Sequence, residues 1–188
     1  MPDESVEDLS PSLVIRLRQG DEAAGAMLER IHGPAMQRFC LGYLSNEADA
    51  RDAVQEIFLQ VLRATVVPDR FRPWLYKVAR NHCLKALRTR RRKPPPGALP
   101  TGSILPQDAT GQLTRMARAE LQERIGELVA ALPDAQSEVL RLRYAENLSR
   151  EDIAEILQVP PALVKTRLFE AMKKLRSQTA GEAEKSSG

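Results

Sequence analysis

The sequence predicts an all-α protein of two small helical domains joined by a flexible linker rich in proline and glycine. Three observations support this fold class. Apolar residues recur at helical spacing along most of the chain, and the alternation that is typical of strands is missing. Residues 93–111 hold eight prolines and glycines in nineteen positions. Beyond residue 148, a short helix, a tight turn and a longer basic helix follow one another.

The N-terminal domain is predicted to span residues 11–92 and to begin with two helices. Apolar residues keep helical spacing over residues 11–32, and the pair Gly33-Pro34 is expected to interrupt the helix there. A second helix then continues to about Leu44.

Two further helices complete this domain. The segment "SNEAD" supplies a turn and a helix cap, and a third, amphipathic helix is predicted over residues 49–64. Pro73 suits the first turn of a fourth helix, which extends to about Thr89. Residues 93–111 then change in composition and are predicted to form the flexible linker.

The C-terminal domain is predicted to span residues 112–177 and contains the most specific signal in the chain, a helix-turn-helix. Ser149, with Asp152 three residues later, is typical of a capping box at the start of its first helix. The turn "QVP" and the proline after it determine where the second helix begins. The polar residues 178–188 are expected to be disordered.

Charge is unevenly distributed along the chain, although the formal net charge is only +3. Residues 1–62 hold eleven acidic and five basic residues, whereas residues 71–93 hold nine basic residues and no acidic one. Such a segment favours a polyanionic partner such as nucleic acid over a merely solvated face. In the helix-turn-helix, Lys165 and Arg167 lie near the end of the second helix that enters a groove, which favours DNA binding over an ordinary helical hairpin.

The composition also argues against several classes of function. The two histidines and two cysteines show no metal-binding spacing, and phosphate-binding loops and nucleophile elbows are missing from the sequence. We therefore expect no enzyme, no metal and no cofactor. Two cysteines make no disulfide framework, the first residues lack a signal pattern, and the longest apolar run has five residues. These features predict a cytoplasmic protein without membrane insertion.

The predicted helix over residues 49–64 has an apolar core face and a polar outer face that includes a leucine. A single exposed leucine is common and needs no explanation. A leucine with a polar rim equally suits a protein contact, and the spacing leaves both interpretations open. The residues of interest on the outer face are Asp52, Gln55, Glu56 and Leu59.

The segment "FRPWLYKVARN" holds three of the eight aromatic residues of the chain, including the single tryptophan. On a helical wheel Trp74 lies outside the apolar stripe, in a separate arc of about 80°. An aromatic face beside cations suits the stacking of an unpaired base. The members of this arc are Trp74, Lys77, Asn81, Lys85 and Arg88.

Three stretches together resemble the extracytoplasmic-function (ECF) sigma factors of bacterial RNA polymerase. "DARDAVQEIFLQVLRA" resembles the segment that binds core polymerase, and "FRPWLYKVARNHCLKALRTRRRK" is similar to the segment that reads and melts the minus-ten element. "ALPDAQSEVLRLRYAENLSREDIAEILQVPPALVKTRLFEAMKKLR" resembles the minus-thirty-five-reading domain. The stretches occur in the order of the family, and the resemblance covers most of residues 12–177.

The resemblance implies a dissociable subunit that binds core RNA polymerase and directs it to promoters, and it suggests an anti-sigma partner. It places core polymerase binding, on the clamp helices of the largest subunit, at Asp52, Gln55, Glu56 and Leu59. It places the minus-ten site at Arg72, Trp74, Lys77, Asn81, Lys85, Arg88 and Arg91, with Asn81 lining a pocket for a flipped base. It places the minus-thirty-five site at Lys165, Thr166, Arg167, Phe169, Glu170 and Lys173.

Two departures from the family pattern affect the second helix of the helix-turn-helix. Ala162-Leu163-Val164 stands where Gly-Thr-Val is common, so a hydroxyl that could touch phosphate is missing. Glu170 stands where basic residues are frequent, and it could accept from a cytosine amino group or pair with a neighbouring lysine. The alternatives to a sigma factor are a helix-turn-helix regulator that never joins polymerase and a degenerate sigma-like interaction module.

Overall fold

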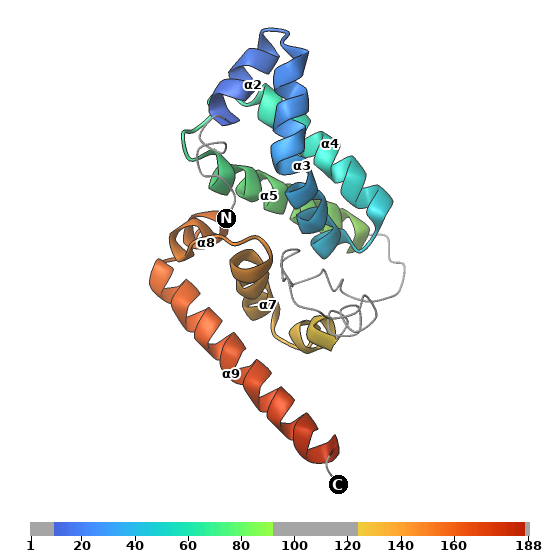
Figure 1. The fold of residues 1–188 in the computed structure, drawn as a ribbon, viewed down its shortest axis with the longest axis vertical. Helices are drawn as coiled ribbons and strands as arrows, with labels where there is room; N and C mark the ends of the chain where they lie inside the picture. Colours follow the sequence, from blue (N-terminus) through green and yellow to red (C-terminus); the bar gives the residue numbers. More distant parts are fainter. Residues whose placement is uncertain (1–9, 92–123, 187–188) are drawn as a thin grey trace, which may run out of the picture. The chain divides into compact units, whose positions relative to one another are not determined.

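Two compact units, Met1–Pro100 and Thr101–Gly188, make up the chain in the computed structural model. The structure describes the backbone of residues 10–91 and 124–186, and the side chains of residues 10–90 and 124–178. All regular elements over these residues are helices, which confirms the predicted all-α class (Figure 1). The predicted linker, residues 93–111, lies outside the described residues. Within the described ranges, no helix has the length and apolar character needed to cross a membrane.

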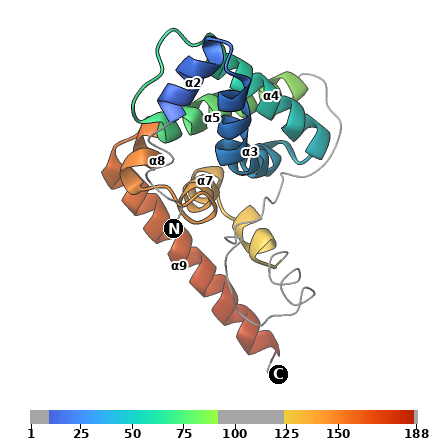
Figure 2. The same ribbon diagram turned by 45° about the horizontal axis from the view of Figure 1, so that its top comes forward.

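Four helices form the described part of the N-terminal unit: α2 (Ser10–Arg18), α3 (Glu22–Leu44), α4 (Glu47–Arg63) and α5 (Phe71–Arg91). Helix α3 is central, since it packs against α2, α4 and α5, and α4 also packs against α5 (Figure 2). The ring of Phe39 lies 5.0 Å from that of Tyr43 and 5.2 Å from that of Tyr76, measured between centroids. This aromatic cluster joins α5 to α3, and it thereby determines which side of α5 faces outward.

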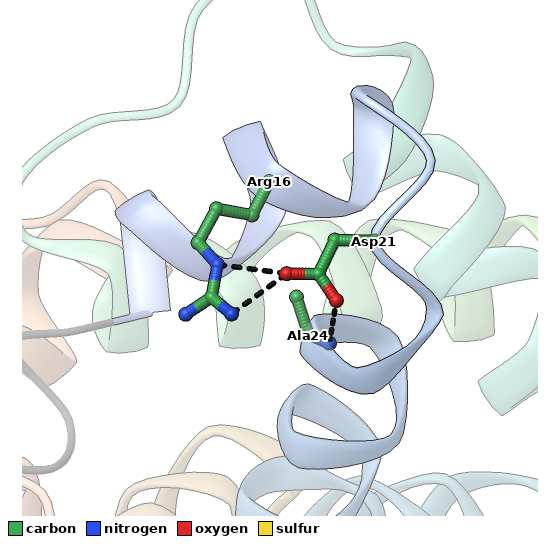
Figure 3. A network of polar contacts seen from close by, with 3 residues as sticks. All are labelled: Arg16, Asp21 and Ala24. Carbon is green, nitrogen blue, oxygen red and sulfur yellow. Dashed lines mark hydrogen bonds and ion pairs between the residues drawn. The ribbon is translucent and has the colours of Figure 1, made fainter.

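The first helical segment breaks at Gly20 and Asp21, so the predicted break at Gly33-Pro34 is wrong. Gly20 has a φ of 92°, a conformation that favours glycine. The Asp21 carboxylate caps α3 by accepting a hydrogen bond from the Ala24 N–H at 3.2 Å. It also accepts from Arg16 Nε at 2.9 Å and Nη2 at 2.6 Å (Figure 3). The bonds from Arg16 first, and then from the backbone, lower the pKa of Asp21.

Helix α3 continues through Pro34. A proline inside a helix costs about 3 kcal/mol relative to alanine. Large side chains on both sides of it, Leu28, Met36 and Phe39 among them, are nevertheless fully buried in one core. Because each such burial contributes about 1.5–3 kcal/mol, packing offsets the cost and keeps the helix continuous.

His32 is a buried polar residue where α2, α3 and α5 meet. Its Nε2 lies 2.8 Å from the Ser10 Oγ, and its ring centroid lies 5.2 Å from that of Phe71. Burial, and secondarily the positive charge of Arg72, lower the pKa of His32 to about 4. The imidazole is therefore neutral in the folded protein at neutral pH.

The C-terminal unit contains a helical segment over residues 124–130, α7 (Asp134–Leu140), the π-helix η1 (Arg141–Ala145), α8 (Arg150–Leu157) and α9 (Pro161–Ser186). Helix α9 packs against α7 and α8 (Figure 1). The long α9 contributes Ala171 to a core cluster, together with partly buried Leu168, Met172 and Leu175. The other buried members of this cluster are Val129, Leu132 and Leu140.

Helices α8 and α9 form the predicted helix-turn-helix, and its capping box is confirmed. The Asp152 N–H donates to the Ser149 Oγ at 3.0 Å, and the Ser149 N–H donates to the Asp152 Oδ2 at 3.2 Å. Gln158 ends α8 in the left-handed conformation, and Pro161 begins α9. Helix α9 extends to Ser186, whereas the sequence predicts a disordered tail from residue 178.

Candidate protein and nucleic-acid interfaces

The outer face of α4 is the first candidate interface. Asn46 caps this helix, its Oδ1 accepting from the Asp49 N–H at 3.0 Å, and Ile57 and Val61 are fully buried on the inner side. Leu59 points away from that core and is 40% exposed. The three polar residues predicted to surround it, Asp52, Gln55 and Glu56, are exposed as well. The four predicted residues therefore share one outward surface with an apolar centre and an acidic rim.

Helix α5 has the two sides that the helical wheel predicts. Leu75, Ala79 and Cys83 are fully buried. Trp74 is half-buried, with its ring centroid 5.7 Å from that of Phe71. The polar members of the predicted arc follow along the helix, half-buried at Lys77 and exposed at Asn81, Lys85 and Arg88. None of these four polar side chains has a hydrogen-bond or ion-pair partner among the described residues, so their donors are available to a ligand.

Arg72 is not part of this arc, although it was predicted in the same site. Two residues correspond to about 200° of helical rotation, so Arg72 lies almost opposite Trp74. Its guanidinium carbon lies 6.0 Å from the centroid of the Tyr76 ring, and its charge acts on His32. The structure therefore places Arg72 against the protein core. The side chain of Arg91 lies outside the described residues.

Two arginines hold the ends of α4, and the sequence interpretation missed both of these contacts. Arg18 Nη2 donates to the carbonyls of Val61 at 3.0 Å and Ala64 at 2.6 Å, where α4 ends. Arg90 forms an ion pair with Asp49 in the first turn of α4 and donates to the Leu44 carbonyl at 3.3 Å. Carbonyls at helix ends need such donors. Arg18 and Arg90 thereby fix the helix that presents Leu59.

Helix α9 presents the third candidate interface. Val164 and Ala171 are fully buried toward the unit core, and the predicted residues lie outside this buried stripe, with Arg167 at its edge. Phe169 is 70% exposed, so a large apolar side chain lies in this outward face. Thr166 is exposed, but its Oγ1 donates to the Ala162 carbonyl at 3.1 Å within the helix. The remaining predicted residues are exposed Lys165, Glu170 and Lys173 and half-buried Arg167.

The carboxylate of Glu170 has a partner that neither sequence-based alternative names. Its Oε2 accepts from Gln136 Nε2 of α7 at 2.9 Å. Neither Lys173 nor Lys174 is paired with it in the described part of the chain. The contact joins residues 34 positions apart, so helical spacing carries no signal of it.

Family models match both units of the chain. The model "Sigma-70 region 2" matches residues 28–93, which include α4 and α5. The model "Sigma-70, region 4" matches residues 122–175, which include the helix-turn-helix.

Curated relatives match nearly the whole chain. The ECF RNA polymerase sigma-E factor of Haemophilus influenzae is 30% identical over 182 residues, covering 89% of this chain and 93% of the relative. The ECF RNA polymerase sigma factor SigW of Bacillus subtilis is 29% identical over 181 residues, covering 87% and 92%.

Solved structures share the fold. CnrH, solved in complex with the cytosolic domain of CnrY, has a TM-score of 0.65 at 24% identity and covers 92% of this chain and 97% of that one. RpoE of Bartonella quintana, solved with the anti-sigma factor NepR, has a TM-score of 0.56 at 22% identity and covers 77% and 89%. With both sigma regions matched in order and relatives covered almost completely, the chain belongs to the ECF family of RNA polymerase sigma factors, non-enzymatic initiation factors that bind core polymerase and direct it to promoters.

Proposed function

We propose that three outward helical faces of this sigma factor each bind a different target. The outer face of α4 docks on the clamp helices of the largest polymerase subunit through Asp52, Gln55, Glu56 and Leu59. The outward arc of α5 binds the melted minus-ten element through Trp74, Lys77, Asn81, Lys85 and Arg88. The outer face of α9 binds the minus-thirty-five element through Lys165, Thr166, Arg167, Phe169, Glu170 and Lys173.

The observation that carries this proposal is the exposure of Leu59 on a helix whose other large apolar side chains are buried or half-buried. An apolar residue with a polar rim is the usual centre of a protein interface. Arg18 and Arg90 hold both ends of α4, so this face is preorganised for docking. A regulator that never joins polymerase has no need of such a surface.

On α5, the proposal rests on an aromatic ring that lies on the same side of the helix as cations without a partner among the described residues. Stacking of one base on an aromatic ring contributes about 1–3 kcal/mol. Lys77, Lys85 and Arg88 are available to bind phosphates, which makes the affinity fall steeply with salt. The Asn81 amide has the donors and acceptor that reading a flipped base requires. Arg72 is left out of this site because it lies against Tyr76.

For the organisation of the chain, we propose an N-terminal sigma domain over residues 11–92, a linker over residues 93–111 and a helix-turn-helix domain over residues 112–177. A linker of nineteen residues reaches about 65 Å when fully extended. Two domains so joined can reach promoter elements about two helical turns, or roughly 70 Å, apart. We further propose that the protein acts in the cytoplasm and is controlled by an anti-sigma protein, since NepR is the anti-sigma partner in the RpoE structure.

The docking face is tested by Leu59→Asp, with Ile15→Asp as the matched control. Both residues are exposed apolar side chains, 40% and 50% respectively, so neither change should unfold the protein. We expect Leu59→Asp to weaken binding to core polymerase at least about tenfold, because it places a charge at the centre of an apolar contact. Ile15→Asp should bind normally. The measurement is a titration of core polymerase with labelled protein, after circular dichroism has verified the fold.

Normal core binding by folded Leu59→Asp would contradict the α4 assignment. Equal losses for both variants would place the contact elsewhere on the N-terminal unit.

A further inference from the structure

The carboxylate of Glu170 is held in place on the outer face of α9. Its Oε2 accepts a hydrogen bond from Gln136 Nε2 at 2.9 Å, and Gln136 itself is only 8% exposed. Glu170 is exposed, and Lys173 lies one helical turn beyond it on the same face. A long acidic side chain on a basic helix therefore has one oxygen anchored, while its other oxygen remains available.

The orientation of the Gln136 amide follows from electrostatics. With the amide turned the other way, its carbonyl oxygen would face the carboxylate oxygen, and two acceptors repel each other. In the observed orientation the Gln136 Oε1 is buried without a partner among the described residues. An unbonded buried acceptor costs free energy, which the charge-assisted bond to Glu170 offsets. Among the described residues, the side-chain amide of Gln136 has one partner, the surface carboxylate of Glu170, and this arrangement suits a positioning role for the amide.

We propose that Glu170 is a specificity-determining residue that selects a cytosine in the major groove, and that Gln136 is its positioning residue. This inference rests on the proposed role of α9 as the minus-thirty-five reader. The free carboxylate oxygen is an acceptor only, and cytosine presents an amino donor at the major-groove edge. Guanine presents two acceptors there and thymine one, so a carboxylate is repelled by both. Adenine presents its amino group beside the N7 acceptor, which makes it a poorer partner than cytosine.

Glu170 should improve discrimination at a cost in general affinity. Phosphates repel a carboxylate, while Lys165 and Lys173 on the same helix attract them. Removal of the negative charge is therefore expected to strengthen binding to DNA of any sequence. The loss of base preference and the gain in general affinity should appear together, and loss of a merely structural residue would produce neither.

The test is in vitro transcription by core polymerase with the full chain, on a promoter library randomised through the minus-thirty-five element. Transcribed promoters are sequenced for the wild type, Glu170→Ala, Glu170→Gln and Gln136→Met. We expect the wild type to prefer cytosine at one position of either strand by at least about fivefold. Glu170→Ala should lose this preference, and Glu170→Gln should shift it toward adenine, with which glutamine pairs through two hydrogen bonds. Gln136→Met should weaken the preference at the same position alone.

The matched control is Glu151→Gln, which removes one exposed carboxylate from α8 instead of α9. It should leave the wild-type profile unchanged. Lys165→Ala and Arg167→Ala report separately on α9 as a DNA-reading helix.

An unchanged profile for Glu170→Ala and Glu170→Gln, with altered profiles for Lys165→Ala and Arg167→Ala, would overturn the role of Glu170 and leave α9 as the reader. Unchanged profiles for all four variants would instead overturn the assignment of α9, and the inference with it. A full loss for Glu170→Ala with no effect of Gln136→Met would overturn the positioning role. Glu170→Gln is nearly isosteric, so at least one variant at this position keeps the fold.

Discussion

The two basic helices, α5 and α9, use their charges differently. On α5 the cations divide between two functions, since Arg72 and Arg90 contact the protein while Lys77, Lys85 and Arg88 have no described partner. On α9 the basic residues Lys165 and Lys173 project outward, and it is the acidic residue that is bonded to a neighbouring helix. A count of basic residues therefore includes two arginines of α5 that contact the protein, and it leaves out the carboxylate of α9 that is bonded to α7.

The difference follows from how each helix is packed. Helix α5 lies against both α3 and α4, so guanidinium groups on its flanks meet helix ends and aromatic rings. Of the predicted residues on α9, Glu170 bonds to a neighbouring helix through the amide of Gln136 on α7, whereas exposed Lys165 and Lys173 have no side-chain partner among the described residues. Arg72 and Arg90 thus contribute to the packing between helices, whereas Lys165 and Lys173 lie on an exposed helix face.

The sharpest test of this comparison is a pair of aromatic substitutions on the two sides of α5. Tyr76 is 2% exposed and packs edge-on against Phe39, so Tyr76→Ala should lower the free energy of unfolding by about 3–5 kcal/mol. Half-buried Trp74 packs only on Phe71 among the described rings, so Trp74→Ala should lower it by about 1 kcal/mol. Trp74→Ala should nevertheless reduce promoter opening about tenfold or more, because a stacking platform is lost. Chemical denaturation and permanganate footprinting measure the two effects.

Two results together would contradict this comparison: Trp74→Ala lowers the free energy of unfolding as much as Tyr76→Ala does, and promoter opening is unchanged. Trp74 would then be a core residue and not part of the outward arc of α5.

A second test uses pH to examine His32 of α3, which is buried against Phe71 of α5. His32 has a pKa of about 4 when folded, against an ordinary value of 6.5. Between these pH values the unfolded chain takes up a proton that the folded chain does not, so stability falls as the pH decreases from 6.5 to 4. The loss should be on the order of 3 kcal/mol at pH 4. His32→Gln keeps a hydrogen-bonding group near Ser10 but cannot titrate, and its unfolding free energy should depend less on pH over this range. If the unfolding free energies of the wild type and His32→Gln changed equally with pH, the lowered pKa of His32 would be contradicted.

The smallest expected effects concern Arg88 and Arg90, two arginines of α5 that differ in their contacts. Arg90 bonds to Asp49 and to the Leu44 carbonyl but is partly exposed, so Arg90→Gln should cost about 1 kcal/mol of stability. Arg88→Gln should leave stability within about 0.5 kcal/mol and weaken promoter binding with a shallower salt dependence. Denaturant titrations and promoter binding at several salt concentrations measure both. The reverse pattern would show that Arg90, and not Arg88, faces DNA.

The sequence predicts well those features that depend on near neighbours. The capping box of Ser149 and Asp152 involves residues three apart, and the outward position of Leu59 follows from helical period alone. The position of Arg72 opposite Trp74 also follows from the helical period, although the family resemblance placed the two residues in one site.

Features that depend on distant contacts could not be predicted in this way. The pair Gly33-Pro34 is a strong break signal, and only the burial of side chains before and after it explains why α3 continues. Arg18, Arg90 and Gln136 each bond to residues more than thirty positions away. Local spacing does not determine which of several arginines or amides makes such a bond.

The separation of faces on α9 has a consequence for how a protein of this kind can diverge. Val164 and Ala171, with the partly buried Leu168, Met172 and Leu175, pack α9 against its unit, and exposed residues such as Lys165 and Lys173 lie between them in sequence. A duplicated copy could therefore acquire a new set of target genes through a few outward substitutions without losing its fold. Position 170 is the exception, since a residue without a side-chain acceptor there leaves the buried amide of Gln136 without that partner. Relatives that have such a residue at position 170 should therefore also differ at position 136, so the two positions should vary together.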